Sequence, residues 1–365
     1  MQLHNSSSNT IILLSLAMVL LHFPSGYSEQ LPLAPAIYVF GDSLVECGNN
    51  NRLPTVSRAD FPPYGTDFPL GPTGRFTNGR TVADFIAEFL GLPLPPPYLS
   101  RRRRLETPTG LNYASSSCGV LPKTGRKYGK CFSLEEQINL FQKTVELEVP
   151  RYYQNEEEIS TYLSKSIFVV CIGNNDYINH IEPDDLHKHR TSSQSFAHLL
   201  IDHLSQKLER LYRLGARKIV IFEIGPLGCI PFVTRRLKHS GKCVEEINMR
   251  VHLFNTLLSS LLKNLTSTLH GSAFVLGHVH WLSYDALMNP SSYGLKDSSN
   301  PCCVTWMNGT SACVPLLVPC QAPDQHYFWD ALRGCLFDLD EVLFKLPLVE
   351  TALESSEWRR LSLEI

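Results

Sequence analysis

A serine near the start of the chain lies where a nucleophile could act. Ser43 follows the apolar run 36–40 after only Gly41 and Asp42. If that run is a buried strand, the serine lies at its carboxyl end, because Gly41 permits a tight turn. The residues after Ser43 could open a helix, whose N-terminus favours developing negative charge. Alone, Gly-Asp-Ser is also typical of an ordinary turn.

Two further segments carry groups that could stabilise an oxyanion. Asn175 lies in the sequence Ile-Gly-Asn-Asn-Asp directly after an expected strand, and its amide can donate a hydrogen bond. The small-residue loop 112–119 ends at Gly119, where a backbone N–H could approach a substrate closely. Taken separately, the first segment is also typical of an Asn-rich turn and the second of a generic loop.

Short apolar strands alternate with amphipathic helices along the chain. Strands are expected at 36–40, 167–172, 218–222 and 273–276, and helices at 81–90 and 195–214. In the second helix, apolar residues recur at helical spacing from Ala197 to Leu211, and Gly215 stands where a C-cap belongs. This order predicts an α/β fold, with a mostly parallel sheet covered by helices on both faces. Sheets of this kind place their sites beyond the carboxyl ends of the strands.

Taken together and in this order, the segments resemble the plant GDSL esterase/lipase family, a branch of the SGNH hydrolases. The resemblance runs from about Ile37 to Asp330. Its carriers are the segments 40–50, 74–80, 112–119, 172–177, 225–231, 289–294 and 328–330. It implies a flavodoxin-like three-layer α/β/α sandwich and hydrolysis of carboxylic esters without a metal or organic cofactor. The expected partner is a small-molecule or lipid ester.

The resemblance also implies a role for four residues. Ser43 matches the nucleophile, which would form an acyl-enzyme intermediate. Its own backbone N–H, the backbone N–H of Gly119 and the side-chain amide of Asn175 match the donors of an oxyanion hole. Asp330, in the sequence Phe-Trp-Asp, matches the acid that orients a catalytic histidine.

The family's histidine lies three residues after that aspartate, and here the position holds Arg333. A guanidinium stays protonated, so it cannot accept the proton of Ser43. It could instead hold Asp330 in an ion pair. We therefore expect this chain to be a poor esterase.

Three explanations for the altered ending stay open. The change after Phe-Trp-Asp is abrupt, which favours an altered reading frame or splice form that replaced the family's ending. A catalytically inactive homologue that binds an ester or lipid is the second explanation. The third is a relocated base, for which His326 is the candidate, whereas His278 and His280 are expected to be surface or structural residues.

The N-terminus predicts secretion. The apolar run 11–23 has the length of a signal-peptide core and is short for a membrane span, with an uncleaved anchor as the alternative. We expect a signal peptide at 1–28, a single hydrolase domain at 29–335 and a divergent tail at 336–365. The net charge of −2 gives no indication of a nucleic-acid partner, and no later run is long enough to span a membrane.

The cysteines and other local signals agree with an extracellular site. Eleven cysteines suit an oxidising compartment. Cys229 with Cys243, and the four cysteines of 302–320, are expected to form disulfides, with zinc binding as the alternative for the cluster. Sequons begin at Asn264 and Asn308. The four consecutive arginines of 101–104 are expected to be a solvated loop, or otherwise a processing site or anionic contact.

Overall fold

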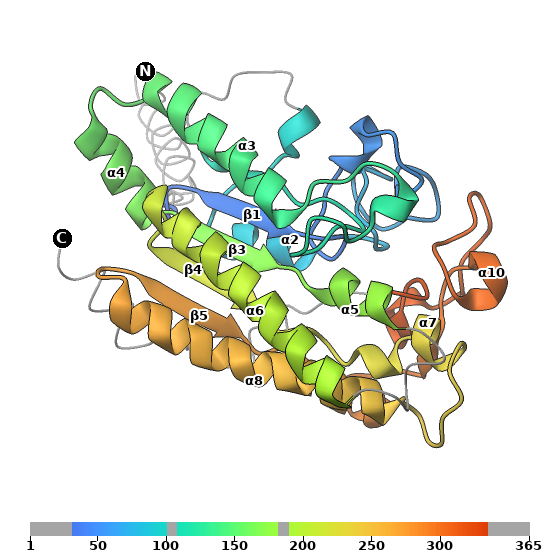
Figure 1. Ribbon diagram of the computed structural model, residues 1–365. Helices are drawn as coiled ribbons and strands as arrows, with labels where there is room; N and C mark the ends of the chain where they lie inside the picture. The colour runs from blue at the N-terminus through green and yellow to red at the C-terminus, as the bar shows by residue number, and fades with distance from the viewer. Residues whose placement is uncertain (1–30, 101–107, 182–189, 335–365) are drawn as a thin grey trace, which may run out of the picture. The chain divides into compact units, whose positions relative to one another are not determined.

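A parallel five-stranded sheet forms the centre of the protein, in the strand order β2-β1-β3-β4-β5 (Figure 1). The computed structural model describes residues 31–100, 108–181 and 190–334, so the expected signal peptide, the arginine run and the divergent tail lie outside the described residues. The strands are β1 (Ile37–Gly41), β2 (Gly110–Asn112), β3 (Ile167–Cys171), β4 (Lys218–Phe222) and β5 (Ala273–Gly277). All neighbouring strands pair in parallel, which confirms the predicted α/β fold.

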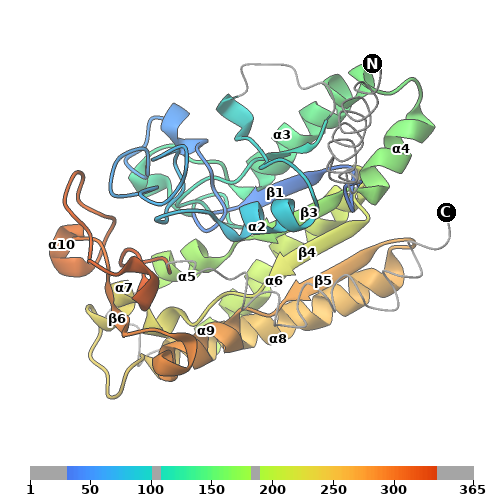
Figure 2. The same ribbon diagram turned by 180° about the vertical axis from the view of Figure 1, so that it is seen from behind.

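Helices cover both faces of this sheet. Figure 1 is viewed from the side of α3 (Leu134–Leu147), α6 (Arg190–Arg213) and α8 (Glu245–Thr268), and Figure 2 from the side of α2 (Val82–Phe89). Side chains alternate along β1, because successive residues of a strand point to opposite faces. Tyr38 and Phe40 therefore pack with the larger set of helices, while Ile37 and Val39 pack with α2.

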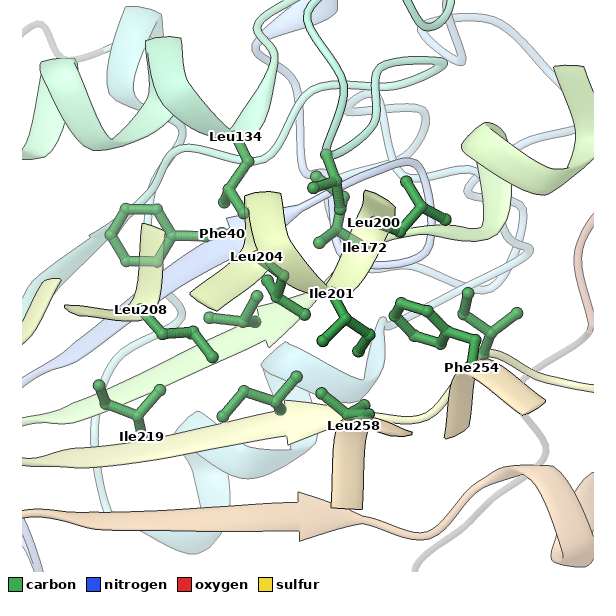
Figure 3. Close-up of a cluster of buried hydrophobic side chains, with 14 of the residues drawn as sticks. Phe40, Leu134, Ile172, Leu200, Ile201, Leu204, Leu208, Ile219, Phe254 and Leu258 are labelled. Atoms are coloured by element: carbon green, nitrogen blue, oxygen red, sulfur yellow. The ribbon is translucent and has the colours of Figure 1, made fainter. Parts of the chain in front are cut away.

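The larger core lies between the sheet and the helices α3, α6 and α8. Figure 3 shows Phe40 from β1 and Ile219 from β4 facing Leu134, Leu204 and Leu258 from these helices. These side chains are buried, as expected where a parallel sheet is covered by helices. The core fixes the strand ends, and therefore the loops that follow them.

The predicted strands and helices lie within one residue of their observed bounds, except that α6 begins five residues earlier than expected. Other elements were not predicted. These are β2, α3, α4 (Glu156–Lys165), α5 (Asn174–His180), α7 (Pro231–Thr234), α8, α9 (His280–Met288), α10 (Trp306–Gly309), and the two strands β6 (Asp297–Pro301) and β7 (His326–Phe328) of a second sheet. At the start of α3, Ser133 and Glu136 form a capping box.

Four disulfides connect loops of the described chain. The expected pair Cys229–Cys243 is present, and the cysteine cluster pairs as Cys302–Cys320 and Cys303–Cys313. The fourth disulfide, Cys118–Cys131, was not predicted. Disulfide formation in the cluster is thereby confirmed. Among the described helices, none combines the length and apolar character needed to span a bilayer.

Candidate active site

A cavity of about 230 Å³ lies beyond the carboxyl ends of the parallel strands. Segments that follow β1, β3, β4 and β5 contribute to its wall, together with α9, which Figure 2 shows close to this edge. Ser43, Asn174, Glu223 and Arg333 belong to its polar lining. The apolar lining includes Phe76, Leu227, Ile230, Leu282, Leu287 and Tyr327. The cavity therefore offers a few polar groups beside a largely apolar wall, as sites for apolar ligands do.

The turn that carries Ser43 is held by Gln137 of α3. The Gly41 N–H donates to Gln137 Oε1 at 2.8 Å, and Gln137 Nε2 donates to the Gly41 carbonyl at 2.9 Å. Gly41 also has no room for a side chain, since a Cβ would lie 2.3 Å from the carbonyl oxygen of Cys171. Glycine at this position thus lets β1 and β3 stay close while the chain turns to present Ser43.

Two buried acids accompany Ser43. Asp42 accepts the Leu44 N–H at 3.0 Å and the Asn174 amide at 3.4 Å, and burial raises the pKa of Asp42 to about 6. Burial raises the pKa of Glu46 to about 8, although its carboxyl accepts the Asn50 N–H at 2.7 Å. Glu46 is therefore mostly protonated at pH 7, so it adds little negative charge near Ser43.

The segments that contain Gly119 and Asn175 lie close together, because Asn175 bonds to Cys118, the residue before Gly119. Asn175 Nδ2 donates to the Cys118 carbonyl at 2.9 Å, which uses one of its two hydrogens. A Cβ on Gly119 would lie 2.2 Å from Asp176 Oδ2, so only glycine fits against that carboxylate. Asp176 in turn accepts the N–H of Val120 at 2.8 Å. The two segments expected to supply oxyanion donors are thus joined by direct contacts, although neither Gly119 nor Asn175 is among the residues that line the cavity.

Asn174 and Phe76 both line the cavity, although neither was predicted from the sequence as a site residue. Asn174 precedes Asn175 at the first turn of α5, where neighbouring residues point in different directions. The sequence placed both asparagines in one motif but carried no signal for which of them lines the cavity. Phe76 lies in the segment 74–80, which carries part of the resemblance. No functional role was predicted for this segment from the sequence.

Asp330 is buried and does not line the cavity, whereas Arg333, which bonds to it, does. Arg333 Nη1 donates to Asp330 Oδ2 at 2.7 Å, and Tyr64 Oη donates to the same oxygen at 2.7 Å. The backbone N–H groups of Leu332 and Arg333 donate to Oδ1 at 2.8 and 2.9 Å. A carboxylate has about four acceptor sites, so these four donors occupy Asp330. The ion pair expected from the sequence is present.

The guanidinium of Arg333 keeps its charge. Burial acts to lower the pKa of Arg333, but Asp330 and Tyr64 outweigh it and raise the pKa above its usual value. The guanidinium also stacks on Phe76, with its central carbon 4.1 Å from the ring centroid. Its Nε is buried and has no hydrogen-bond partner among the described residues. Arg333 is thus a fixed cation that can donate hydrogen bonds but cannot accept a proton.

No histidine of the described chain lines the cavity, and none bonds to the hydroxyl of Ser43. His326 Nδ1 lies 3.0 Å from the Ala322 carbonyl oxygen and 3.3 Å from Cys320 Sγ. His280 Nδ1 lies 3.0 Å from the backbone oxygen of Ile224, and His278 is exposed beside Glu223. These positions agree with the structural and surface roles expected for His280 and His278.

Comparison with known proteins assigns the family. The model of the GDSL-like lipase/acylhydrolase family matches residues 37–332. GDSL esterase/lipase 7 of Arabidopsis thaliana is 46% identical over 311 residues, which cover 84% of this chain and 85% of the relative. A second Arabidopsis GDSL esterase/lipase is 40% identical over 344 residues, which cover 91% of this chain and 89% of the relative. The chain belongs to the GDSL lipase/acylhydrolase family.

Membership confirms the resemblance seen in the sequence and makes the chain, by family, a carboxylic ester hydrolase. The match to the family model ends at residue 332, one position before Arg333. Among solved structures, phospholipase A1 from Streptomyces albidoflavus NA297 is 13% identical with a TM-score of 0.37, covering 79% of this chain and 94% of that chain. This likeness is too small to bear on the fold, which follows from the parallel sheet itself.

Proposed function

We propose that the chain is a secreted hydrolase of acyl or lipid esters that acts through an acyl-Ser43 intermediate and is impaired by Arg333. Ser43 lines the cavity at the end of β1, which supports its role as nucleophile. Its own N–H, the Gly119 N–H and the second hydrogen of the Asn175 amide are the proposed oxyanion donors. The apolar wall of the cavity suits the acyl part of an ester.

The single observation that carries the proposed impairment is the ion pair between Arg333 and Asp330. A serine hydroxyl is a weak nucleophile unless a neighbouring group accepts its proton. Arg333 cannot accept that proton, and it engages the carboxylate that would orient an imidazole. An oxyanion hole alone leaves a residual rate, on the order of 10³-fold over water in serine hydrolases. We therefore expect slow turnover.

The proposed route to the cell exterior rests on the apolar run 11–23 and on the disulfides. In this proposal residues 1–28 are a signal peptide and residues 29–335 form one hydrolase domain. Glycosylation at Asn264 is part of the same proposal, because its sequon would meet the glycosylation machinery during secretion. Detection of the chain in the medium of secreting cells, with an N-terminus near Ser28, tests the route; retention of residues 1–28 would contradict it.

Turnover of a short-chain nitrophenyl ester tests the nucleophile in a chain that carries a family-like ending with a histidine after Asp330, and in the same chain with Ser43→Ala. Ser43→Ala should lower the rate of that chain by on the order of a thousandfold or more, to the residual rate of the oxyanion hole. Equal activity in both would reject Ser43 as the nucleophile. Sequencing of the transcript across the codons after Asp330 tests the origin of Arg333. A normal transcript that continues with Phe- or Tyr-His would show that the ending with Arg333 comes from an altered splice form.

A further inference from the structure

The segment from Cys302 to Cys320, called here the apolar loop, projects at the carboxyl-end side of the sheet. It contains α10, which Figures 1 and 2 show at the edge of the protein, away from the five-stranded sheet. No charged residue occurs between Asp297 and Asp324 in the sequence. A surface segment of this length without a charge is unusual, because charged side chains cover most protein surfaces.

The apolar loop exposes aliphatic and aromatic side chains instead. Met307, Leu316 and Val318 are 77%, 78% and 84% exposed. The full set of its exposed large apolar residues is Val304, Trp306, Met307, Leu316, Leu317 and Val318. Single exposed apolar residues are ordinary, but a group of this size on one short loop marks an interaction site.

The loop is built to keep these side chains exposed. The disulfides Cys302–Cys320 and Cys303–Cys313 close its base, which is buried against Trp329 and Tyr64. Met307 and Leu316 have φ angles of 56° and 65°, a left-handed conformation that bulky residues rarely adopt. A strained backbone that displays apolar side chains is typical of functional segments. The base also packs on Phe76, which lines the cavity, so the loop adjoins the candidate active site.

Basic side chains flank the apolar loop. Arg235 Nη1 donates to the Gly309 carbonyl at 2.9 Å, which joins the segment after α7 to the tip of the loop. Arg236 and Lys238 follow and are exposed. No acidic residue occurs between Glu223 and Glu245 in the sequence. The acids closest to the loop along the chain are Asp324, which is exposed four residues after Cys320, and Asp297, five residues before Cys302, whose carboxylate is bonded to Asn300.

An uncharged apolar loop, bonded at its tip to Arg235 of a segment that also contains the exposed Arg236 and Lys238, matches the surface of a lipid aggregate with anionic headgroups. The aliphatic side chains can enter the boundary between headgroups and acyl chains, and indole rings favour that boundary. Each nearby Lys or Arg adds attraction to the anionic surface. We propose that the apolar loop, with Arg235, Arg236 and Lys238, docks the protein on such a surface and so brings the cavity next to acyl esters.

Binding of the full chain to phosphatidylcholine vesicles, with and without phosphatidylglycerol, tests this proposal by co-flotation. The chain should bind the vesicles that contain phosphatidylglycerol, and Leu316→Glu with Val318→Glu should lower its partition coefficient by on the order of tenfold or more. Lys238→Gln should lower it about fivefold at low salt and less at high salt. Absence of binding by the unchanged chain, or equal binding by the double variant, would overturn the proposal.

Two controls separate docking from loss of fold and from loss of catalysis. Leu147→Glu changes a residue that is 61% exposed at the end of α3, beside α4, and it should leave binding unchanged. If the double glutamate variant unfolds, Leu316→Asn with Val318→Asn replaces it, with the thermal midpoint measured for each. Ser43→Ala should leave docking unchanged, since vesicle binding is measured without turnover, so failure of the proposed hydrolase function, on which the role of docking rests, is distinguishable from failure of the docking proposal.

The sequon at Asn308 provides an independent test. Asn308 is exposed beside Met307 at the tip of the loop, where a glycan would separate the apolar side chains from a lipid surface. The docking proposal therefore expects Asn308 of the secreted chain to carry no glycan, in contrast to Asn264. The mass of the peptide that contains Asn308 decides this, and full occupancy by a glycan would contradict the proposal.

Discussion

The two segments that meet at the cavity differ in how fully their buried polar groups are hydrogen-bonded. In the turn after β1, both backbone groups of Gly41 bond to Gln137, and Asp42 accepts two hydrogen bonds. In the segment after β7, the Nε1 of Trp329 and the Nε of Arg333 are buried without a partner among the described residues. Each unmatched buried donor costs free energy. The polar groups named in the first segment have hydrogen-bond partners, whereas the second segment contains an arginine with a buried N–H that has none.

In the proposed function, the part of the site around Ser43 supplies the nucleophile and the part around Asp330 lacks a base, and the two parts differ in this structural respect as well. The backbone after Asp330 still folds back, since Arg333 carbonyl oxygen accepts the Trp329 N–H at 3.0 Å. In the proposed function, its Arg333 cannot accept the proton of Ser43. Changes to the second segment should therefore restore activity, and changes to the first should only remove it.

Replacement of the ending should have the largest effect. In a chain where a family-like Tyr-His-Pro-Thr ending follows Asp330 at the proper spacing, kcat/KM for a nitrophenyl ester should rise on the order of a thousandfold, because a base then accepts the Ser43 proton. Arg333→His alone should give a smaller gain, since Gly334 and the residues after it are unchanged. Activity that falls in any other order among these three chains would contradict the comparison.

Loss of an oxyanion donor should come next. In the grafted chain, Asn175→Ala should lower kcat about a hundredfold or more with little change in KM, because the donor acts mainly in the transition state. Asn174→Ala is the matched control, since Asn174 lines the cavity but bonds to Asp42. A larger kcat loss in the Asn174 variant would assign the donor to that residue instead.

Removal of the support under Gly41 should reduce stability. Gln137→Leu leaves the N–H of Gly41 buried without a partner, while the Gly41 carbonyl keeps the hydrogen bond from the Ser115 N–H at 3.0 Å. The loss should lower the free energy of unfolding by about 2–3 kcal/mol. Denaturant unfolding measures this, with the exposed Gln154→Leu as a control that should change little. A loss no greater than that of the control would show that the turn does not depend on Gln137.

A pH profile of stability should show the smallest effect. Glu46 has a pKa of about 8 in the folded chain, above its usual 4.5, so its contribution to stability is complete below about pH 4.5 and is lost as the pH rises through 8. The chain should lose on the order of 2 kcal/mol from this group between pH 5 and pH 7. Glu46→Gln should make the profile less steep in this range. A profile that Glu46→Gln leaves unchanged would show that burial does not shift this pKa.

The strands and α6 were predictable because their signals are local. The runs in β3 and β4 are rich in β-branched residues, and α6 shows helical spacing of apolar residues over several turns. The strands β2 and β6 lacked such signals. β2 has three residues and forms only by pairing with β1, and the sequence of β6, Asp-Ser-Ser-Asn-Pro, disfavours a strand in isolation.

The candidate site was partly predictable for a similar reason. The sequence predicted that Ser43 and Arg333 lie at the edge where the strands end, and both line the cavity there. It could not show that Asn174 lines the cavity while Asn175 bonds to Cys118, because adjacent helical residues differ in direction. It also could not provide the pairing of the four cysteines in 302–320, which depends on distances in the folded chain.

The most direct test of the central claim is the rate at which an alkyl fluorophosphonate labels Ser43. Such probes react with a serine whose proton can be accepted, so the rate reports activation of the hydroxyl without any need for turnover. We predict slow labelling of the unchanged chain and labelling about a hundredfold faster or more in the chain with the family-like ending, with the adduct located on Ser43 by mass spectrometry. Rapid labelling of Ser43 in the unchanged chain would contradict the account and would direct attention to His326 or another histidine as a relocated base.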